Sequence, residues 1–508
     1  MNVSETYDYI VVGAGASGSV IANRLSELEN ATVLLLEAGA DTIPDTVDIP
    51  YRWAEHHFTP IDWVYWTAEQ AALGGRKVYL AAGKGIGGSG NLYHMIHLRG
   101  QALDYDNWAY HGATGWSWQD VLPYFQKLES QEDDTNPTAG HGGPVNVINA
   151  GRHQPNPLSQ TFLDACAELG HPSTPDFNAQ LTGAGWHHLD IKDGKRFGVR
   201  QAYLLPALGR PNLTLSADSR ATKLIFEGDR VAGVEYVRAG ETRQARAGSE
   251  VILCANGLET PKLLMLSGIG QESHLRRFGI DVRLNLPGVG ENYHDHVLIV
   301  APVNMTDRAA PEPTMNMSEV CLFANTGGWA VPDVQIGFIH RAQFQPEPHP
   351  QLVTMLPGLV RPLARGTLRL ASADPLEAPL ADPRYLSHPS DRERMVDAFE
   401  MARDLFRTRA FADWGVKEVT PGDGVSSRED VTEFVKQNLG SYYHYVGACK
   451  MGVDELAVVD PRLRVHGVEG LRIADASVMP EVTTGNCHTA VVMVAERAAD
   501  FIKQDAAS

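Results

Sequence analysis

The stretch Tyr7-Asp8-Tyr9-Ile10-Val11-Val12-Gly13-Ala14-Gly15-Ala16-Ser17-Gly18 decides the fold of this chain. It joins an apolar run rich in β-branched residues to the spacing G-x-G-x-x-G, and an amphipathic stretch over residues 19–28 follows. A second apolar run, residues 33–36, then ends in Glu37. Strand, glycine turn, helix, strand and terminal acid succeed one another in this way in a βαβ dinucleotide-binding unit.

Each part of this motif has a physical role in holding a dinucleotide. Gly13 allows a tight turn, Gly15 lets the backbone approach a pyrophosphate, and Gly18 lets the helix pack closely on the strand. The helix N-terminus supplies free N–H groups to the phosphates, and Glu37 is placed to accept hydrogen bonds from an adenosine ribose. The predicted binding residues of this unit are Gly13, Gly15, Ala16, Ser17, Gly18, Glu37 and Ala38. The alternative is a structural βαβ turn that binds no ligand.

The bulk composition bounds the class of protein. At 508 residues the chain is long enough for two or more domains. Its 43% hydrophobic and 21% charged residues are typical of a globular protein with a large core. The net charge of -19 argues against binding to nucleic acid or to anionic lipid. Alternatively, the acidity only keeps the protein in solution.

The sequence gives no sign of a membrane span, an export signal or a metal site. No apolar run approaches the roughly 18 residues that cross a bilayer, and the N-terminal residues lack a basic segment. Cys166, Cys254, Cys321, Cys449 and Cys487 are too widely spaced for a metal or disulfide pattern. We therefore expect a cytoplasmic protein with reduced thiols.

Glycine turns, short apolar runs and amphipathic stretches predict further elements. Residues 82–90 form the densest glycine loop, and the polar stretch 129–143 predicts an exposed connection. Strands are expected at residues 213–215, 222–226, 231–237 and 250–255, with a helix at 260–266. Short alternating runs between residue 299 and about residue 370, broken by prolines, suggest an antiparallel sheet. Amphipathic helices are expected at residues 393–409, 427–438 and 490–503.

Five further motifs follow the N-terminal unit in order. They are Gly83-Lys84-Gly85-Ile86-Gly87-Gly88-Ser89, the block 256–270, Pro287-Gly288-Val289-Gly290-Glu291-Asn292 with Asp295-His296, the block 444–452, and Leu471-Arg472-Ile473-Ala474-Asp475-Ala476-Ser477-Val478-Met479-Pro480. In this order the chain resembles the glucose–methanol–choline (GMC) oxidoreductases, FAD enzymes that oxidise alcohols. One departure is Asn256-Gly257, because glycine followed by a small residue is usual there.

The resemblance implies an α/β fold with two domains. A Rossmann-like FAD-binding domain would comprise residues 1–155, 205–297 and 440–508. A second, α+β substrate domain, built on an antiparallel sheet, would comprise residues 156–204 and 298–439. The active site would lie between the domains, over the flavin ring.

Alcohol oxidation by a flavin needs a base for the hydroxyl proton and an acceptor for the hydride. Histidine suits the base because its ordinary pKa lies near neutrality. The resemblance implies that His444 is this base and that His488 orients the hydroxyl and the developing alkoxide. The two roles could be exchanged, and the pair could titrate as one unit. From the residues alone, either histidine could be structural. A metal pair is rejected because no third ligand lies at helical or loop spacing nearby, which leaves only ligands far apart in the sequence.

The resemblance also implies the remaining flavin contacts. Asp475 is expected near the ribityl or pyrophosphate group, Asn486 near the flavin pyrimidine ring through backbone N–H groups, and Ala221 at the adenine. Capping or turn chemistry is the alternative for these three. The expected set beyond the N-terminal unit is Gly83, Gly87, Gly88, Ser89, Asn91, Leu92, Tyr93, Ala221, Asp475, Ala476, Asn486 and His488. Leu92 stands where some relatives carry a covalent histidyl–flavin bond, and since leucine has no nucleophile, we expect non-covalent FAD.

Several aromatic and imidazole side chains are expected beside the flavin. Tyr93 stands where the family usually has Asn or His, and His94 stands where most members have a smaller residue. Tyr442, Tyr443 and Tyr445 surround the expected base. They suggest a compact pocket for flat primary alcohols of benzylic, furanic or pyridoxine-like type, with His94 bonding a polar group on the substrate ring. Alternatively, the tyrosines only pack the domain interface.

The predicted function is FAD-dependent oxidation of a primary alcohol to an aldehyde, with oxygen or another electron acceptor re-oxidising the flavin. A choline-type alcohol dehydrogenase, a hydroxynitrile lyase of the same family and a flavin-bound scaffold without catalysis are the alternatives. The presence of both His444 and His488 argues against a scaffold. Bleaching of the flavin by an alcohol under anaerobic conditions would exclude a lyase as the sole activity.

Overall fold

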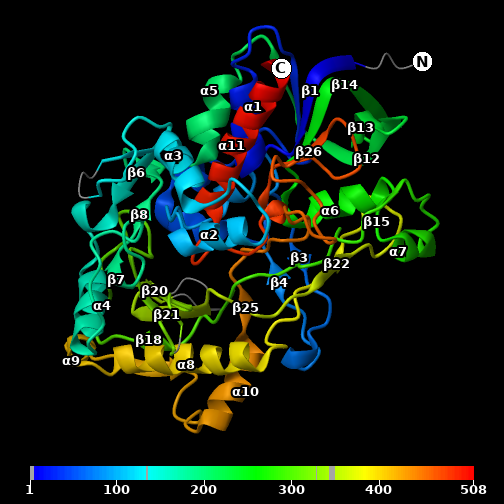
Figure 1. Cartoon of the computed structure of the whole chain (residues 1–508). Coiled ribbons are helices and arrows are strands. Elements are labelled where there is room, and N and C mark those ends of the chain that lie inside the picture. Colours follow the sequence, from blue (N-terminus) through cyan, green and yellow to red (C-terminus); the bar gives the residue numbers. More distant parts are fainter. Residues whose placement is uncertain (1–4, 133–135, 328, 342–348, 508) are drawn as a thin grey trace.

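Two large β-sheets organise the chain, one in the upper part of Figure 1 and one in its lower left. The computed structural model describes residues 5–132, 136–327, 329–341 and 349–507. Strand β1 and helix α11, with which the described part of the chain begins and ends, both lie at the first sheet (Figure 1). The N-terminal and C-terminal segments therefore contribute to the same part of the molecule.

The first sheet is built around the N-terminal motif. Its strands are β1 (Glu5–Val12), β2 (Val33–Leu36), β11 (Leu213–Ser216), β12 (Ser219–Glu227), β13 (Arg230–Arg238), β14 (Glu241–Leu253) and β26 (Leu471–Ile473). Strands β11, β2, β1 and β14 run parallel in that order, and β26 pairs with β14. Strands β12 and β13 extend β14 as an antiparallel arm. The parallel part confirms the predicted Rossmann-like sheet.

The apolar run of β1 is continuous because both of its faces are covered. Residues 10–12 are at most 4% exposed, as is typical of a parallel strand between helical layers. Helices α1 (Ala16–Leu25) and α11 (His488–Ala507) pack side by side here (Figure 1). Arg24 of α1 donates to Glu496 of α11 at 2.7–3.1 Å. Helix α1 begins three residues before the predicted Ser19, directly after the extended Gly15.

The second sheet has eight strands and is antiparallel. They are β7 (Gly183–Trp186), β17 (Val297–Leu298), β18 (Val303–Met305), β19 (Val320–Ala324), β20 (Val334–Ile339), β21 (Leu352–Leu359), β24 (Lys417–Thr420) and β25 (Gly440–Ser441). Their pairings are all antiparallel. The antiparallel sheet predicted between residues 299 and 370 is therefore confirmed.

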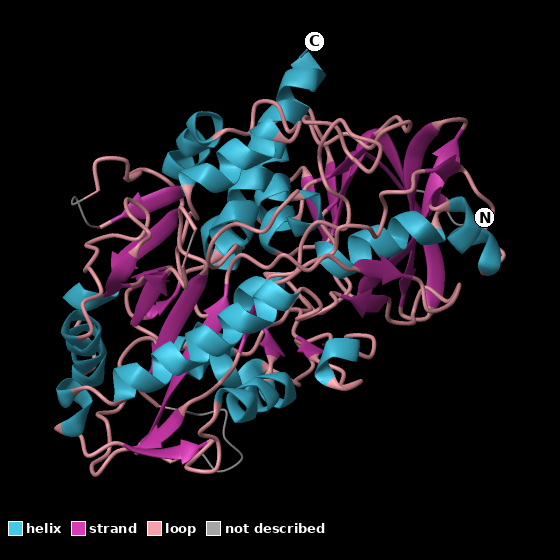
Figure 2. Ribbon diagram, turned by 60° about the horizontal axis from the view of Figure 1, so that its bottom comes forward, coloured by secondary structure: helices cyan, strands magenta, loops and turns pink. Residues whose placement is uncertain are grey.

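The two faces of the second sheet have different neighbours. Along β19, Val320 and Leu322 pack with helices α4 (Pro157–Glu168) and α8 (Pro389–Phe406), whereas Cys321 and Phe323 pack with residues 95–98. This alternation follows from the period of two in a strand. Figure 2 shows the long helix α8 lying across the strands. The face opposite α8 packs against the segment that follows the glycine loop of residues 82–90.

The remaining helices and short strands connect these layers. The helices are α2 (Ala102–Tyr110), α3 (Trp118–Leu128), α5 (Leu205–Ala207), α6 (Asn256–Leu266), α7 (Glu272–Arg277), α9 (Arg409–Ala412) and α10 (Arg428–Asn438). The short strands are β3 (Tyr65–Trp66), β4 (Tyr79–Leu80), β5 (Glu129–Gln131), β6 (Val145–Asn149), β8 (His188–Leu189), β9 (Ile191–Lys192), β10 (Lys195–Arg196), β15 (Ile269–Gly270), β16 (Leu284–Asn285), β22 (Thr367–Arg369) and β23 (Leu380–Asp382). The four helices predicted in the second half of the chain are found as α6, α8, α10 and α11. The domain boundaries remain a prediction.

The stretch 129–143 is only in part the exposed connection that its polarity suggests. Glu129 is fully buried in β5, and Gln131 and Asn136 are only 4% and 3% exposed. The prediction was wrong for these residues because their polar groups find partners inside the protein, such as Arg99 and His97 for Glu129. Residues 133–135 of this stretch lie outside the described residues.

Asn256 explains why glycine is usual at the start of the second motif. Its backbone is left-handed, with φ +74°, and its Oδ1 accepts hydrogen bonds from the N–H groups of Leu258 (2.8 Å) and Glu259 (3.2 Å). We expect Asn256→Ala to lower the free energy of unfolding by about 1–2 kcal/mol, because the helix cap is lost and alanine disfavours this φ. Asn256→Gly should cost less, since glycine adopts this φ freely. Denaturant unfolding of the two variants measures both values, and equal losses would contradict the account.

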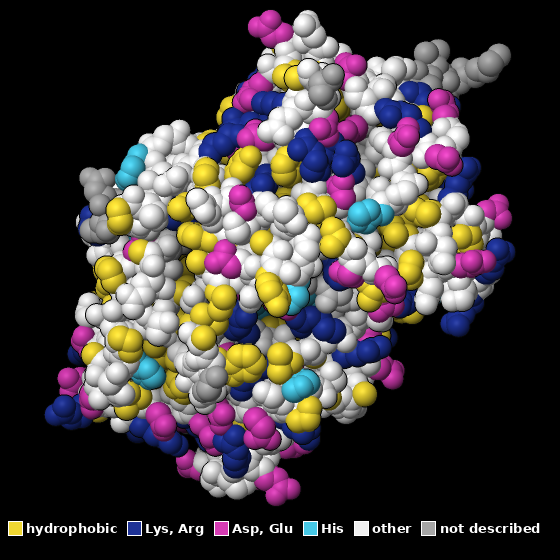
Figure 3. Space-filling model, in the orientation of Figure 1, with side chains coloured by type: hydrophobic (Ala, Val, Ile, Leu, Met, Phe, Trp, Pro, Cys, Tyr) yellow, Lys and Arg dark blue, Asp and Glu magenta, His cyan; other side chains and the backbone are white. Residues whose placement is uncertain are grey.

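Charged side chains of both signs are interspersed over the face seen in Figure 3. The net charge of -19 is thus not gathered into one acidic surface on this face. All five cysteines are buried free thiols. Over the described ranges, no helix carries an apolar stretch long enough to cross a bilayer.

Candidate active site

A long pocket extends from the carboxyl end of β1 to His444 and His488. In an open α/β sheet, ligands bind at this end of the strands. The predicted residues that line it are Gly13, Gly15, Ala16, Ser17, Glu37, Ala38, Gly83, Gly88, Ser89, Leu92, Tyr93, His94, Ala221, Tyr442, Tyr443, His444, Asp475, Ala476, Asn486 and His488. The structure thus brings together segments from the whole length of the chain.

Three predicted residues lie behind the pocket lining and shape it. A Cβ atom on Gly18 would come within 1.7 Å of the Gly13 carbonyl oxygen, so only glycine allows the helix to sit this close. The N–H of Gly87 donates to the Ala14 carbonyl at 2.8 Å, and Asn91 Nδ2 donates to the Ile86 carbonyl at 2.8 Å. These contacts hold the two glycine loops against each other.

The two loops present bare backbone to the pocket where they meet. Gly13 has φ +101°, a conformation that side chains disfavour. A Cβ atom on Gly88 would approach the Cα atom of Gly15 to 2.6 Å. Such a surface allows close approach of a pyrophosphate to backbone N–H groups.

Glu37 joins both loops through its carboxylate. It accepts hydrogen bonds from the N–H groups of Ala14 (2.8 Å), Gly39 (2.8 Å) and Gly85 (3.0 Å). A carboxylate has about four acceptor positions, so one remains for a ligand hydroxyl. The residue predicted to meet an adenosine ribose therefore also organises the loops around it.

The loop that carries His444 is anchored by a buried carboxylate. Asp295 accepts hydrogen bonds from the His444 N–H (2.7 Å), Ser441 Oγ (2.5 Å) and Tyr385 Oη (2.5 Å). Burial raises the pKa of Asp295 to about 6, although these donors oppose the rise. The anchor fixes the backbone of His444 independently of its imidazole ring.

The His444 ring is held on two sides. Its Nδ1 lies 3.0 Å from Nδ1 of His296, and its Nε2 lies 3.4 Å from the amide nitrogen of Asn486. Oδ1 of Asn486 accepts from Gln335 Nε2 at 3.1 Å, which directs the amide nitrogen toward His444. In this arrangement His444 carries its proton on Nδ1, and the lone pair of its Nε2 accepts from the Asn486 amide. Burial, together with His488, lowers the pKa of His444 to about 3, so the ring is neutral.

His488 stands at the first turn of α11 and faces a tyrosine. Its ring centroid lies 4.2 Å from that of Tyr93. Burial lowers the pKa of His488 to about 4. Both predicted catalytic histidines are therefore half-buried, neutral and part of one pocket lining.

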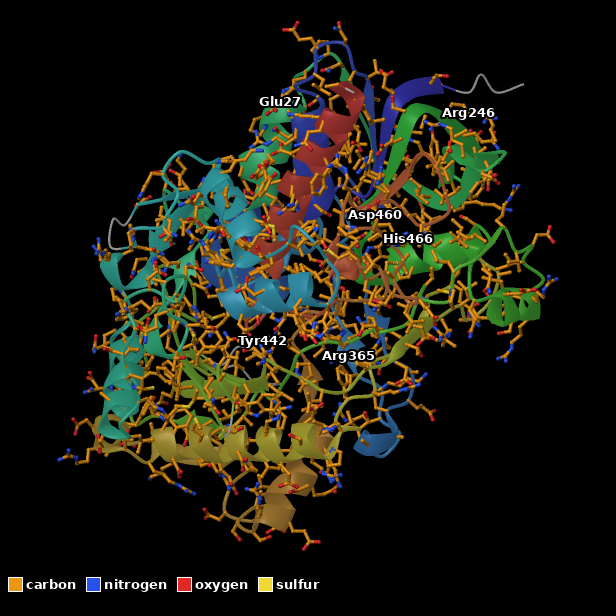
Figure 4. The ribbon with its side chains drawn as sticks, in the orientation of Figure 1. Glu27, Arg246, Arg365, Tyr442, Asp460 and His466 are labelled. Atoms are coloured by element: carbon orange, nitrogen blue, oxygen red, sulfur yellow. The ribbon has the colours of Figure 1, made fainter. Side chains whose placement is uncertain are left out.

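Aromatic and imidazole rings form the outer wall of the pocket. His94 packs on Trp53 with ring centroids 3.6 Å apart, and the pKa of His94 is lowered well below its usual range by burial. His57 lies 5.6 Å from Tyr443, which is 38% exposed at the mouth. Tyr442 stacks on His444 with centroids 5.0 Å apart, and Figure 4 shows Tyr442 between α2 and the strands of the second sheet.

The carboxylates of the described lining belong to the predicted dinucleotide-binding part of the pocket. They are Glu37, Glu259 and Asp475. Glu259 accepts from Tyr65 Oη at 2.7 Å, and Asp475 accepts from Ser477 and from Thr260 Oγ1 (2.5 Å). Among the described residues, the lining around His444 and His488 contains none of these acids.

Sequence reasoning missed four residues of the site. Asp295 and His296 were visible only as part of a family block, without a role. His57 and Trp53 carried no signal, because they belong to the irregular segment between β2 and β3. Their contacts to Tyr443 and His94 depend on the tertiary fold.

Comparison with known proteins agrees with this geometry. Residues 7–298 match the N-terminal model of the GMC oxidoreductases, and residues 362–495 match the C-terminal model. The chain belongs to the GMC oxidoreductase family. It is 37% identical to the mitochondrial choline dehydrogenase of Homo sapiens over 98% of this chain and 90% of that protein. It is 36% identical to the oxygen-dependent choline dehydrogenase of Staphylococcus xylosus over 99% of this chain and 95% of that protein.

Solved structures show the same fold. The crystal structure of pyridoxine 4-oxidase from "Mesorbium loti" superposes with a TM-score of 0.92 at 31% identity, covering 99% of each chain. A fungal aryl-alcohol oxidase, at 24% identity and a TM-score of 0.87, shares the fold. As a GMC oxidoreductase, this chain is an FAD-dependent enzyme that acts on CH–OH donors. The bare glycine loops and the length of the pocket fit that cofactor.

Proposed function

We propose that this GMC oxidoreductase oxidises an uncharged primary alcohol with a flat aromatic or heteroaromatic ring, of benzylic, furanic or pyridoxine-like type. The observation that carries the proposal is the lining around His444 and His488. Its rings are neutral imidazoles and phenols, and the described part of it holds no carboxylate. A flat ring packs well on the pocket-lining rings of His94 and Tyr442, whereas a cation there would lose its hydration without an anionic partner.

His444 acts as the base in this proposal. Its Nε2 lone pair accepts the proton of the substrate hydroxyl, while His296 holds Nδ1. His488 donates to the oxygen and stabilises the alkoxide as it develops. Bound FAD supplies the acceptor for the carbinol hydride. His94, a neutral ring on the opposite wall, bonds a polar substituent of the substrate ring.

The cofactor would be held by the residues that line the rest of the pocket. Gly13, Gly15 and Gly88 would meet the pyrophosphate, Glu37 the ribose and Ala221 the adenine. Asp475 and the backbone at Asn486 would meet the ribityl chain and the pyrimidine ring. Gly18, Gly87 and Asn91 would support these contacts from behind.

We expect FAD to be bound without a covalent bond. Leu92 lines the pocket where the relevant attachment would form, and its side chain offers no nucleophile. Acid precipitation should release all flavin absorbance into the supernatant. Flavin that remains in the washed pellet would contradict this expectation.

Anaerobic titration of the flavin absorbance tests the substrate class. Benzyl alcohol, 5-hydroxymethylfurfural, pyridoxine, choline and glucose are added separately to the purified enzyme. We expect one of the ring alcohols to bleach the flavin at a concentration at least about tenfold below that of choline, a difference of about 1.4 kcal/mol. Bleaching by choline alone would overturn the proposal, and bleaching by none would favour a lyase of the hydroxynitrile type. Air is then admitted: recovery of the oxidised flavin absorbance identifies oxygen as an electron acceptor, and its absence indicates another acceptor.

Choline-type oxidation is the second candidate. The sequence relatives are choline dehydrogenases, and an aromatic face such as that of Tyr443 can bind a quaternary ammonium. The same titration separates the two candidates.

For the location we propose the cytoplasm, since the five free thiols suit a reducing compartment.

A further inference from the structure

A row of buried ionisable side chains lies behind the pocket wall at His488. Asp190 accepts a hydrogen bond from Tyr93 Oη at 2.6 Å, and its other oxygen lies 2.7 Å from Nδ1 of His97. Nε2 of His97 lies 2.8 Å from Glu129, which also pairs with Arg99. The side chains of His97, Arg99, Glu129 and Asp190 are at most 3% exposed. We call these five residues the Asp190 network.

The geometry fixes the charges of this network. Both ring nitrogens of His97 face carboxylate oxygens, which accept hydrogen bonds and donate none when ionised. His97 is therefore doubly protonated. Burial lowers its pKa, but Asp190 and Glu129 outweigh burial and raise the pKa to about 9. Burial alone would raise the pKa of Glu129. The cationic His97 and Arg99 outweigh burial and lower this pKa to about 2.

Tyr93 connects the network to the active site. Its ring lines the pocket and packs against His488 at 4.2 Å between centroids. Its hydroxyl is tied to Asp190, and the Arg196 guanidinium lies 5.3 Å from its ring centroid. The phenol is thus held at its far end, so its ring cannot turn away from the imidazole.

The network also acts on the charge of His488. Beyond burial, Asp190 raises the pKa of His488, whereas His97 and Arg196 lower it. The two members of the Asp190–His97 ion pair thus act in opposite directions on the pKa of His488, the residue proposed to meet the substrate oxygen. Buried ion pairs are costly to desolvate and often add little stability, which favours a role in the site over one in the fold.

We propose that Asp190 is a positioning residue for the alcohol oxidation: it holds Tyr93 against His488 and balances the charge of His97, so that His488 keeps one orientation and one protonation state. The proposal rests on the proposed role of His488 in alcohol oxidation. Asp190 itself touches neither the pocket nor the cofactor region; it acts through Tyr93.

Asp190→Asn separates these roles, because an amide has only one accepting end. Either the Tyr93 hydroxyl or the His97 Nδ1–H must then face an NH₂ group, and His97 loses its anionic partner. We expect kcat for the alcohol that bleaches the flavin to fall about 10-fold to 100-fold, with KM changing less than about threefold. In ¹⁵N-histidine NMR of the FAD-loaded enzyme at pH 7.5, wild-type His97 should show two protonated nitrogens, and the variant one.

Tyr93→Phe provides the second variant, and it keeps the test valid if Asp190→Asn fails to fold. It removes one hydroxyl and keeps the ring against His488. We expect a similar fall in kcat, and in the double variant the two effects should not add, since they act on one contact. Glu418→Gln is the matched control: it breaks the pair with Arg403 (2.6–2.9 Å) in the second sheet, and kcat should stay unchanged.

The outcomes separate this proposal from the proposed function. If His97 loses its second proton in Asp190→Asn while kcat stays at the wild-type value, the positioning role is wrong. Wild-type kcat in Tyr93→Phe would overturn it equally. If His97 is already singly protonated in the wild-type enzyme, the charge assignment is wrong. If no alcohol bleaches the wild-type flavin, the proposed function fails, and the NMR result still decides the charge of His97.

Discussion

Replacing His444 with alanine is expected to lower kcat by about 10²–10⁴-fold, the usual contribution of a general base. In the proposed reaction, the substrate hydroxyl takes the place of the Asn486 amide at the Nε2 lone pair of His444. The loop should keep its place, because Asp295 holds the His444 backbone N–H rather than the ring. FAD should therefore remain bound. Anaerobic stopped-flow measurement of flavin reduction gives the rate, and the flavin absorbance per protein reports the bound cofactor.

His488→Ala and Tyr443→Phe complete this experiment. The tyrosine variant is the control, because Tyr443 lies beside the base but is 38% exposed at the mouth. Its rate should stay within about threefold of the wild-type rate, roughly 0.7 kcal/mol. A larger loss in His488→Ala than in His444→Ala would exchange the roles of the two histidines. Flavin reduction at the wild-type rate in His444→Ala would show that the base lies elsewhere.

The parts of the fold that depend on local sequence were predictable. The run from Tyr9 to Gly18 specifies strand, turn and helix within a few residues, because β-branched residues favour the strand and glycine the turn. The short alternating runs broken by prolines between residue 299 and about residue 370 likewise indicated an antiparallel sheet. Both sheets were expected for this reason. Helix α1 begins earlier than its amphipathic pattern suggests. Residues 16–18 belong to the helix, but as part of the glycine motif they do not follow the amphipathic pattern.

The contacts that shape the site depend on residues far apart in sequence. His296 and His444 are separated by 148 positions, and His97 and Asp190 by 93. The periodicity of a sequence does not reveal pairs that are so far apart. The family resemblance therefore predicted His444 and His488 as site residues, but not the residues that contact them. Glu129 was predicted to be exposed for the same reason. An acid in a polar stretch normally lies at the surface, unless the fold brings a cation such as Arg99 into contact with it.

The enzyme is expected to lose stability steeply as the pH falls below about 6. Burial lowers the pKa values of seven histidines farthest: His94, His187, His294, His296, His340, His444 and His488. In the unfolded chain each takes up a proton near pH 6.5, whereas in the folded protein each stays neutral. The unfolded state then binds more protons, so the free energy of unfolding rises with pH and falls on acidification.

Four buried acids, Asp104, Asp295, Glu319 and Asp475, oppose this trend without cancelling it, because burial raises the pKa of each. Burial raises the pKa of Asp295 to about 6 and of Glu319 to about 7, so both take up protons in the folded state first. Each titrating group contributes about 1.4 kcal/mol per pH unit, and seven histidines against four acids leave about 4 kcal/mol per pH unit below pH 6. A domain stability of about 5–15 kcal/mol would be consumed within roughly one to four units. His97 acts in the opposite sense, since its raised pKa favours folding below pH 6.5 and this contribution is lost as the pH rises through about 9.

Urea unfolding of the holoenzyme between pH 8 and pH 4.5 measures this slope directly. His340→Gln provides the decisive comparison, because both ring nitrogens of His340 lie buried without a hydrogen-bond partner in the described part of the chain. Removing this one ring should reduce the slope by about 1.4 kcal/mol per pH unit and leave flavin reduction unchanged. A flat stability between pH 6 and pH 5 would mean that the buried rings accept protons in the folded protein. His444 would then be protonated there as well, and it could not serve as a base below pH 6.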